Sequence, residues 1–478
     1  MSDYLLVTDN IAPMSDAPGA LGALGLATAL ASANHRVVVL AQAAPEILAR
    51  QTGLARRLRP VLVTMRAVRS TGEANGAVIN GGPVPTSSAS TPLELPLFEG
   101  RPTASAAHLF VLGVEPSSRG RTSALLGAAA EALVRDGVIR ADVAIGWGDC
   151  SAIALAALSS SRRILVVPDG RASATLPPEE VDLLAEPEDP EVSDSLLGRA
   201  AMDADAVVVP SPSAAAEIGA HPALAGRPSD QPLAVIRLGC DDPPHDPSSD
   251  PALPHHFSPS APAGKLECRK ALARRLTLAV GPRTLLVVAP PLSPGPGAEA
   301  LLTALTQLGG LDVAVILPTR TASAADRSLA ERARILAIEN PGRMALLENL
   351  APAGNRELLA GADAAIFVAS DDLTGRGPGL ALRYGALPLA PDAAASGDFL
   401  VDYDDRSATG TALLYAAHDS FELAGAIRRA VTLRTDRERW DALVVSLLTS
   451  APTWGATSAR LDLLAEEAVK AAPAPILP

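Results

Sequence analysis

The residues best placed to do chemistry lie in a glycine-rich segment that follows an apolar run in the second half of the chain. The segment reads Asp371-Asp372-Leu373-Thr374-Gly375-Arg376-Gly377-Pro378-Gly379. A strand, a glycine-rich turn and a helix start place backbone N–H groups where a phosphate can bind, and Arg376 could add a cation. A tight strand-to-helix turn without a ligand needs the same glycines. Because no Gly-Lys-Ser/Thr follows, both interpretations stay open on this segment alone.

Other candidate motifs are weaker. Gly19, Gly22 and Gly25 are spaced three apart after the first apolar run, which is not a dinucleotide-binding pattern and favours a helix packed closely on a neighbour. His255 and His256 have no third candidate ligand nearby, so no metal site and no cofactor are expected. The chain contains no G-x-S-x-G or H-E-x-x-H pattern, so hydrolase chemistry has no support.

Composition narrows the range of partners and compartments. The net charge of −13 argues against a nucleic-acid partner, because neutralising phosphates needs a basic face. No apolar stretch reaches about 18 residues, so we expect no membrane span. Cys150, Cys240 and Cys268 lie far apart, which fits a reducing compartment and predicts a cytoplasmic protein. Only three of the 40 basic residues are lysines.

The elements that must position these residues are short apolar runs that alternate with Ala/Leu-rich segments. This pattern predicts an α/β fold with parallel sheets covered by helices on both faces. In the first half the expected strands are Tyr4–Thr8, Arg36–Leu40, Val61–Met65, His108–Val114, Val143–Trp147, Ile164–Val167, Ala206–Val209 and Ala234–Leu238. In the second half they are Leu285–Ala289, Val313–Leu317, Met344–Leu347, Ala364–Val368 and Leu387–Ala390, with helices such as Ala298–Leu308 and Ala322–Ala337.

Two irregular segments interrupt this alternation. The Pro/Asp-rich stretch 241–262 is expected to connect two doubly wound domains, at 1–240 and 263–455. Residues 456–478 are expected to form a C-terminal helix and tail that pack back on the N-terminal domain. The stretch Ser70–Thr103 is expected to be an insertion or a long surface loop. Ligands of such sheets bind at the carboxyl ends of the strands, so two facing domains predict a cleft between them.

Several stretches, taken in order, resemble the bacterial glycogen synthase and plant starch synthase family. The matching stretches include Val7-Thr8-Asp9-Asn10-Ile11-Ala12-Pro13, Gly239-Cys240-Asp241, Gly264-Lys265, Cys268-Arg269-Lys270-Ala271-Leu272, Gly361-Ala362-Asp363-Ala364 and Trp454. Members of this family are retaining glucosyltransferases of GT-B fold that transfer glucose from ADP-glucose to an α-1,4-glucan. The resemblance implies two Rossmann-like domains, a nucleotide-sugar donor, an α-glucan acceptor and no metal.

The motifs that bind the donor in this family are largely replaced. Where the family has Lys-x-Gly-Gly-Leu, the chain reads Ser15-Asp16-Ala17-Pro18-Gly19, so Asp16 lies in the segment that has lost the lysine. Where the family has Arg-Leu-x-x-Gln-Lys-Gly, the chain reads Pro291-Leu292-Ser293-Pro294-Gly295-Pro296-Gly297. Both cations of the second motif are therefore prolines, Pro291 and Pro296, while Gly297 is retained.

The remaining site motifs change in a similar way. The family's His-Asp-Trp-His corresponds to Trp147-Gly148-Asp149-Cys150, and its Ile-His-Asn stretch to Val167-Pro168-Asp169. In the Glu-Pro-Cys-Gly-Leu-Thr motif the glutamate falls on Asp372 and the first glycine on Gly375. The resemblance thus implies that Asp372 is the residual catalytic position. It also implies that Gly19, Gly297, Gly375, Arg376 and Gly377 face the donor, and that Asp16, Cys150, Asp169, Pro291 and Pro296 are degenerate positions.

The lost cations have a large expected effect on activity. A hydrogen bond to a charged group contributes about 1.5–3 kcal/mol, so removing three cations costs on the order of 5–9 kcal/mol, or roughly three to six decades in kcat/KM. We therefore expect a degenerate glucosyltransferase that acts as a binding or regulatory protein, on α-glucan or with an active paralogue. The alternatives are an active glucosyltransferase with an altered donor or acceptor, and a scaffold without sugar contacts.

Overall fold

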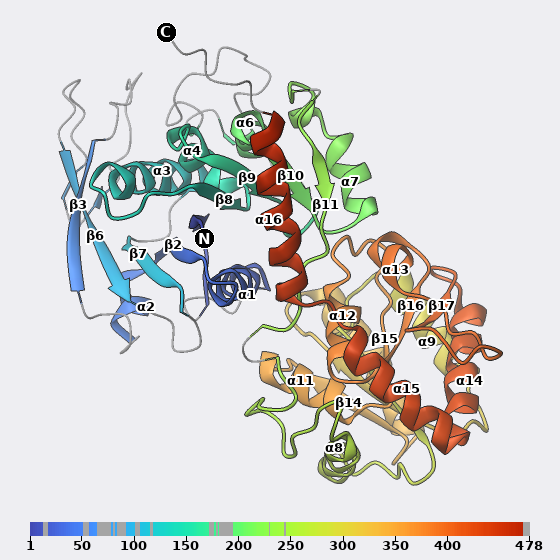
Figure 1. Ribbon diagram of the computed structural model, residues 1–478. Coiled ribbons are helices and arrows are strands. Elements are labelled where there is room, and N and C mark those ends of the chain that lie inside the picture. The colour runs from blue at the N-terminus through green and yellow to red at the C-terminus, as the bar shows by residue number, and fades with distance from the viewer. Residues whose placement is uncertain are drawn as a thin grey trace. The chain divides into compact units, whose positions relative to one another are not determined.

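The chain divides into two compact units, each with its own sheet. The computed structural model describes residues 1–12, 18–50, 57–64, 78–79, 82–83, 92–100, 106–114, 118–171, 176–177, 180, 195–228, 230–242 and 245–471. Unit 1 comprises Met1–Leu238 together with Trp454–Pro478, and unit 2 comprises Gly239–Thr453. Both units alternate strands with helices, as Figure 1 shows.

Unit 1 is built on a nine-stranded sheet with the order β11-β10-β9-β8-β1-β2-β7-β6-β3. Its strands are β1 (Asp3–Thr8), β2 (Arg36–Ala43), β3 (Arg57–Thr64), β6 (Pro92–Gly100), β7 (His108–Gly113), β8 (Val143–Trp147), β9 (Arg162–Val166), β10 (Ala206–Val209) and β11 (Leu233–Val235). Its described helices are α1 (Pro18–Ser32), α2 (Pro45–Arg50), α3 (Arg119–Arg135), α4 (Ala152–Ala157), α6 (Leu196–Asp203), α7 (Pro212–Gly219) and α16 (Trp454–Ala471), with 3₁₀ turns η1 (Asp149–Ser151) and η2 (Pro222–Leu224). A separate pair, β4 (Val78–Ile79) and β5 (Gly82–Pro83), is antiparallel.

The central strands of unit 1 are buried on both faces, which explains why they read as continuous apolar runs. All five residues of β8 and all four of β10 are buried, and both strands begin and end where the sequence predicts. The order reverses at β1, which has β2 on one side and β8 on the other. The carboxyl ends of β1 and β8 therefore form the position where ligands of doubly wound sheets usually bind.

One expectation for unit 1 is wrong. The stretch Ser70–Thr103 is not a loop throughout, because β6 lies within it and runs antiparallel to both β3 and β7. The prolines of β6 make this strand difficult to predict from the sequence, because proline lacks the backbone N–H that a strand donates to its neighbour in a sheet. In the structure Pro96 faces Pro60 of β3, so the two missing donors share one position of the ladder.

Two of the three spaced glycines of α1, Gly22 and Gly25, serve close packing, which confirms the sequence analysis for these two residues. A Cβ at Gly25 would lie 2.2 Å from Nε1 of Trp454, and one at Gly22 would lie 2.8 Å from Cζ2 of Trp147. Trp454 begins α16, which packs on α1 and β9. The glycines thus form a notch for two buried indoles, whose ring centroids are 6.0 Å apart.

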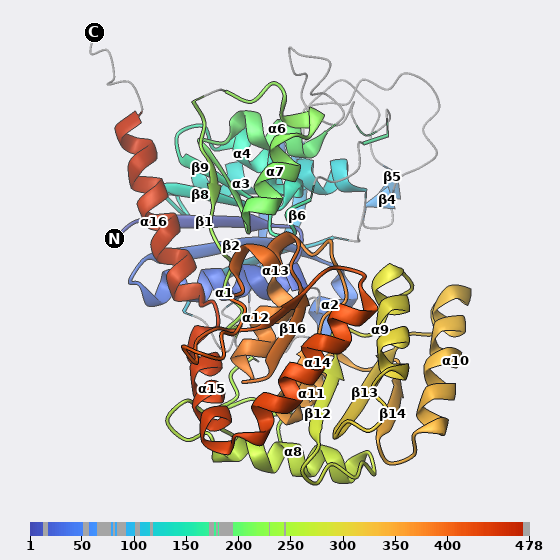
Figure 2. The same cartoon turned by 90° about the vertical axis from the view of Figure 1, so that its right-hand side faces the viewer.

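Unit 2 is built on a six-stranded parallel sheet with the order β14-β13-β12-β15-β16-β17. Its strands are β12 (Thr284–Val288), β13 (Val313–Thr319), β14 (Met344–Glu348), β15 (Ala364–Ile366), β16 (Leu387–Pro391) and β17 (Leu413–Tyr415). Its helices are α8 (Ala263–Arg275), α9 (Pro296–Thr306), α10 (Ala324–Glu339), α11 (Pro352–Gly361), α12 (Arg376–Arg383), α13 (Ala394–Phe399), α14 (Ser420–Thr435) and α15 (Arg437–Ser450). Figure 2 shows α9 and α10 beside β13 and β14. The strand order reverses between β12 and β15.

Buried polar side chains attach the segment 241–262 to unit 2. Asp242 is fully buried, and its Oδ2 lies 3.0 Å from Nδ1 of His245. Asp250, also buried, accepts a hydrogen bond of 2.9 Å from Nε of Arg356 and another from the hydroxyl of Tyr384. Since a buried carboxylate is tolerated only with such partners, these contacts fix the path of the segment on α11 and α12.

Candidate functional site

The switch point of unit 2 brings together seven of the sequence-predicted site residues. The loop after β12 leads into α9, and the loop after β15 leads into α12. The first loop and its helix start hold Pro291, Pro296 and Gly297, and the second holds Asp372, Gly375, Arg376 and Gly377. The two loops touch, because a Cβ at Gly297 would lie 2.1 Å from the carbonyl oxygen of Val368.

Proline begins α9 at the position where the family resemblance implies a lysine. Pro296 is the first helical residue, and the N–H of Glu299 donates to the carbonyl of Gly295 at 3.2 Å. The first-turn N–H groups of a helix lack partners within the helix and favour anions. Gly297 and Ala298 supply such groups here, but Pro296 supplies neither an N–H nor a charge.

The glycines of the second loop are required by the turn itself. Gly375 has φ of +62°, a left-handed conformation, and a Cβ there would lie 2.2 Å from Cε1 of Phe399. A Cβ at Gly377 would lie 3.0 Å from Cε1 of Phe367. The positive φ and the close contact account for Gly375 without a ligand, and Gly377 packs tightly on Phe367, while the same backbone leaves a helix N-terminus at the sheet edge.

The side chain of Asp372 closes this turn. Its Oδ1 accepts hydrogen bonds from the N–H of Thr374 at 2.9 Å, from the Thr374 hydroxyl at 2.8 Å and from the N–H of Gly375 at 3.2 Å. A carboxylate that accepts backbone N–H groups of its own loop stabilises a turn. Asp372 thus has a structural role at the position that the family resemblance assigns to catalysis.

The guanidinium of Arg376 binds within unit 2. Its Nη2 donates to Oδ2 of Asp242, and its Nη1 donates to the carbonyl of Gly239 at 3.3 Å. Burial opposes ionisation of Asp242, but the hydrogen bond with His245 and the charge of Arg376 together lower its pKa. A phosphate at the glycine turn would therefore compete with a buried carboxylate for the cation of Arg376.

A serine and a histidine that sequence reasoning missed meet at the same edge. Ser370 Oγ, after β15, lies 2.8 Å from Nε2 of His418, after β17, and both side chains are exposed. The neighbouring Asp419 caps α14 by accepting from the N–H groups of Phe421 and Glu422. The two residues are 48 positions apart and carry no shared motif, so no sequence signal could have paired them.

In unit 1 the corresponding edge carries carboxylates. Asp149 follows β8 and pairs with Arg119 at the start of α3, while Asp9 follows β1. Burial raises the pKa of Asp149 against the opposing effect of Arg119, and burial also raises the pKa of Asp9. The thiol of Cys150 lies close to Asp9, Asp149 and Arg119, and burial, with the two nearby carboxylates, raises its pKa to about 12. The thiol therefore stays protonated and is a poor nucleophile.

The other unit 1 candidates are more peripheral. Asp169 is exposed in the turn after β9, where its Oδ1 accepts from the N–H of Arg171 at 3.4 Å, and its charge contributes to the raised pKa of Asp149. Gly19 is the second residue of α1, and Asp16 lies outside the described residues.

Within the described parts of the chain, no group of three or more His, Cys, Asp or Glu side chains could hold a metal ion. Among the helices that the structure describes, none is long and apolar enough to cross a membrane.

Comparison with curated protein sequences finds glycogen synthases from several bacteria as relatives. The chain is 31% identical over 269 residues to a glycogen synthase of Anaeromyxobacter dehalogenans strain 2CP-C, covering 55% of each protein. It is 29% identical over 226 residues to a glycogen synthase of Methylocella silvestris, covering 46% of each. The chain thus matches only about half the length of these curated relatives. No family model matches the chain.

Solved structures match over nearly the whole chain. The catalytic domain of starch synthase IV from Arabidopsis thaliana, bound to ADP and acarbose, matches with a TM-score of 0.76 at 18% identity, covering 98% of this chain and 99% of that one. Sucrose-phosphate synthase from Thermosynechococcus elongatus matches with a TM-score of 0.57 at 12% identity, covering 99% of this chain. At such identities the likeness shows the fold, which is GT-B. The sequence similarity to glycogen synthases over about half of the chain agrees with this likeness to the catalytic domain of a starch synthase.

Proposed function

We propose that this protein is a glycogen synthase-like glucosyltransferase that has lost catalysis and acts as a binding or regulatory protein of α-glucan metabolism. One observation carries the proposal. At the switch point of unit 2 the two positions that hold diphosphate-binding cations in the family are Pro291 and Pro296, and the nearby Arg376 binds Asp242. Without those cations the developing charge of a nucleoside diphosphate leaving group is poorly stabilised.

The edge of unit 1 supports a sugar ligand rather than a phosphate. Asp9 and Asp149 offer carboxylate oxygens near the carboxyl ends of β1 and β8, with Arg119 as their nearest cation. Carboxylates accept hydrogen bonds from hydroxyl groups and repel phosphates. We therefore propose an α-glucan as the ligand of highest affinity and assign a nucleotide sugar only weak binding.

Three buried free thiols, Cys150, Cys240 and Cys268, support a cytoplasmic, reducing compartment.

The direct test is calorimetric titration with ADP-glucose, combined with an assay of glucose transfer to glycogen. A glycogen synthase with complete motifs serves as the positive control. We expect no transfer above background and an affinity for ADP-glucose far weaker than micromolar. Binding in the low micromolar range together with transfer would overturn the proposal.

The second candidate is an active glucosyltransferase with an altered donor or acceptor. Retention of the glycine turn with Asp372 at its closing position favours it. If any nucleotide sugar supports transfer, Asp372→Ala should abolish turnover, and an unchanged product yield would count against Asp372 as the catalytic position. If neither maltoheptaose nor any nucleotide sugar shifts the melting temperature, the protein is a scaffold instead. An active paralogue as partner is tested by co-purification from cell extract with and without glycogen.

A further inference from the structure

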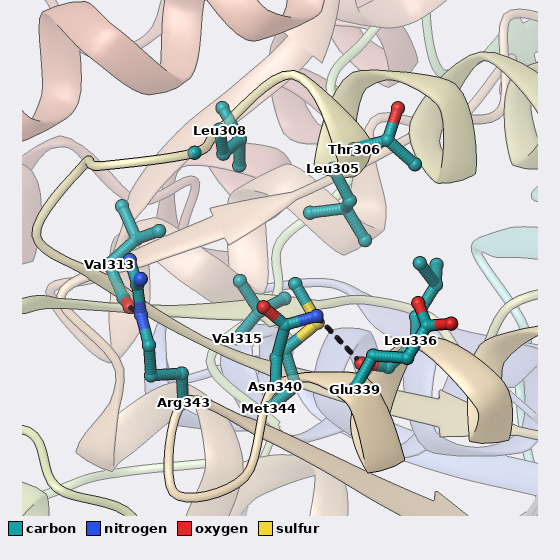
Figure 3. A pocket seen from close by; sticks show the side chains of 11 residues that line it. Leu305, Thr306, Leu308, Val313, Val315, Leu336, Glu339, Asn340, Arg343 and Met344 are labelled. Carbon is teal, nitrogen blue, oxygen red and sulfur yellow. Dashed lines mark hydrogen bonds between the residues drawn. The ribbon is translucent and has the colours of Figure 1, made fainter.

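Unit 2 contains a cavity of about 220 Å³ at the edge of the sheet opposite the glycine turns. It lies between the C-terminal ends of α9 and α10 and the first residues of β13 and β14, as Figure 3 shows. Its apolar wall is made by Leu305, Leu308, Val313, Val315, Leu336 and Met344. At about 30 Å³ per water in the liquid, the volume corresponds to roughly seven water molecules.

The polar groups of the cavity direct several of their donors to carbonyls of the protein. The hydroxyl of Thr306 donates to the carbonyl of Thr303 at 2.7 Å, and Nδ2 of Asn340 donates to the carbonyl of Leu336 at 2.9 Å. Arg343 donates from Nη2 to the carbonyl of Leu311 and from Nε to that of Val313. In Figure 3 its guanidinium lies beside Val313, away from Asn340.

The side chains that line the cavity also present hydrogen-bond acceptors to a ligand. Asn340 retains its Oδ1, Thr306 retains the lone pairs of its hydroxyl, and Glu339 contributes a carboxylate. Two helices also end here, with C-caps at Gln307 and Asn340. The last carbonyls of a helix carry about half a negative charge, which favours cations within one turn. The lining holds one cation, Arg343, whose guanidinium donates to backbone carbonyls, and one carboxylate, Glu339.

We propose that this cavity binds a small organic monocation, a primary ammonium group attached to a hydrocarbon body of about six carbons. The ammonium has three donors and no acceptor, which complements Glu339 and Oδ1 of Asn340. The hydrocarbon would pack against Leu305 and Met344. The site goes beyond the proposed function, because it lies at the far end of α9 from Pro296, about 15 Å away at 1.5 Å per residue.

The probe is hexylammonium chloride, titrated into the full chain by calorimetry or ligand-observed NMR, with hexanol and hexanoate as controls of the same hydrocarbon. We expect hexylammonium to bind saturably and about fivefold or more tightly than hexanol, with hexanoate weakest. Glu339→Gln should weaken hexylammonium about three- to tenfold and leave hexanol unchanged. Glu331→Gln, the same substitution on an exposed residue of α10, should change neither affinity.

Several results would overturn the site. Hexanol or hexanoate binding as tightly as hexylammonium would remove the basis for cation recognition. Absence of saturation for hexylammonium, or equal effects of Glu339→Gln and Glu331→Gln, would do the same. Leu305→Trp, which fills the cavity, should abolish binding of hexylammonium. If that variant does not fold, the pair of glutamate variants still decides, because both residues are exposed. None of these titrations involves a nucleotide or a glucan, so their failure is distinct from failure of the proposed function.

Discussion

The carboxyl edges of the two sheets are built from different groups, backbone glycines in unit 2 and charged side chains in unit 1. In unit 2 the backbone defines the edge, since Gly297 and Gly375 leave no room for a Cβ, and prolines lie where the family resemblance implies cations. In unit 1 the edge holds charged side chains, Asp9 and Asp149 with Arg119, around a protonated thiol. The difference teaches that the edge of unit 2 is determined by backbone geometry on which the fold itself depends. The edge of unit 1 is determined by charged side chains.

The largest expected effect comes from restoring the cations of unit 2. Pro291→Arg with Pro296→Lys should tighten ADP binding by about two to four decades, because two charged hydrogen bonds contribute about 3–6 kcal/mol. Calorimetric titration with ADP measures the change.

The control places one such positive charge in the other unit, again at a proline that begins a helix. Pro212→Lys alters the proline that begins α7 of unit 1 and should leave ADP affinity unchanged. An equal gain from this control would mean that added charge alone explains the effect. No gain from the double variant would mean that the edge of unit 2 no longer accepts a diphosphate at all.

Next in size is the buried carboxylate behind the glycine turn. Asp242→Asn should lower the free energy of unfolding of unit 2 by about 2–4 kcal/mol, because Arg376 loses its charged partner in a poorly solvated position. Urea unfolding followed by far-UV circular dichroism measures the loss. Asp441→Asn, which removes an exposed pair with Arg437, should change stability by at most about 0.5 kcal/mol. Similar losses in the two variants would argue that the pair with Arg376 is no more than a surface contact.

Glycine substitutions compare the packing demands of the two units. Gly297→Ala and Gly25→Ala should each cost about 1–3 kcal/mol, since the added Cβ would meet the carbonyl of Val368 or the indole of Trp454. Gly425→Ala is the control, because its site in α14 has nothing within 4 Å, and it should stabilise by about 0.5–1 kcal/mol. Thermal melts rank the three variants. Tolerance of alanine at Gly297 would remove the structural explanation for its retention.

The smallest effect is an opposite response of the two edges to pH. The raised pKa of Asp9 and Asp149 means that folded unit 1 binds their protons more tightly than the unfolded chain, so their charge weakens unit 1 at neutral pH and weakens it less as the pH falls toward 3.8. The lowered pKa of Asp242 means that its contribution to unit 2 is present above 3.8 and is lost as the pH falls below that value.

Asp9→Asn tests the first of these responses. It should stabilise unit 1 by at most about 1 kcal/mol at pH 7, with the gain shrinking toward pH 4. Tryptophan fluorescence in a Trp440→Phe background follows unit 1 alone, because Trp147 and Trp454 are then the only indoles. Asp136→Asn, at an exposed residue of unit 1, should give no such gain. A gain that grows toward pH 4 would contradict the sign.

Local pattern predicted more of the fold than of the site. The strand at Val143–Trp147 was predictable because a strand buried on both faces is an unbroken apolar run, whereas β6 was missed because its prolines resemble a loop. The site depends on partners distant in sequence. Arg376 binds Asp242 across 134 positions, and Ser370 meets His418 across 48. Such pairs follow from the order of strands in the sheet, which no short segment encodes.

The notch that Gly22 and Gly25 form for Trp454 has a consequence for synthesis. Trp454 and Leu461 belong to the buried core of unit 1, yet all of unit 2 is translated between Leu238 and Trp454. At about 5–20 residues per second, the ribosome needs roughly 10–40 s to cover that interval. During this time the apolar face of α1 is not yet covered by the indole of Trp454, while unit 2 can already fold. Unit 1 therefore cannot complete its core until all of unit 2 has been synthesised.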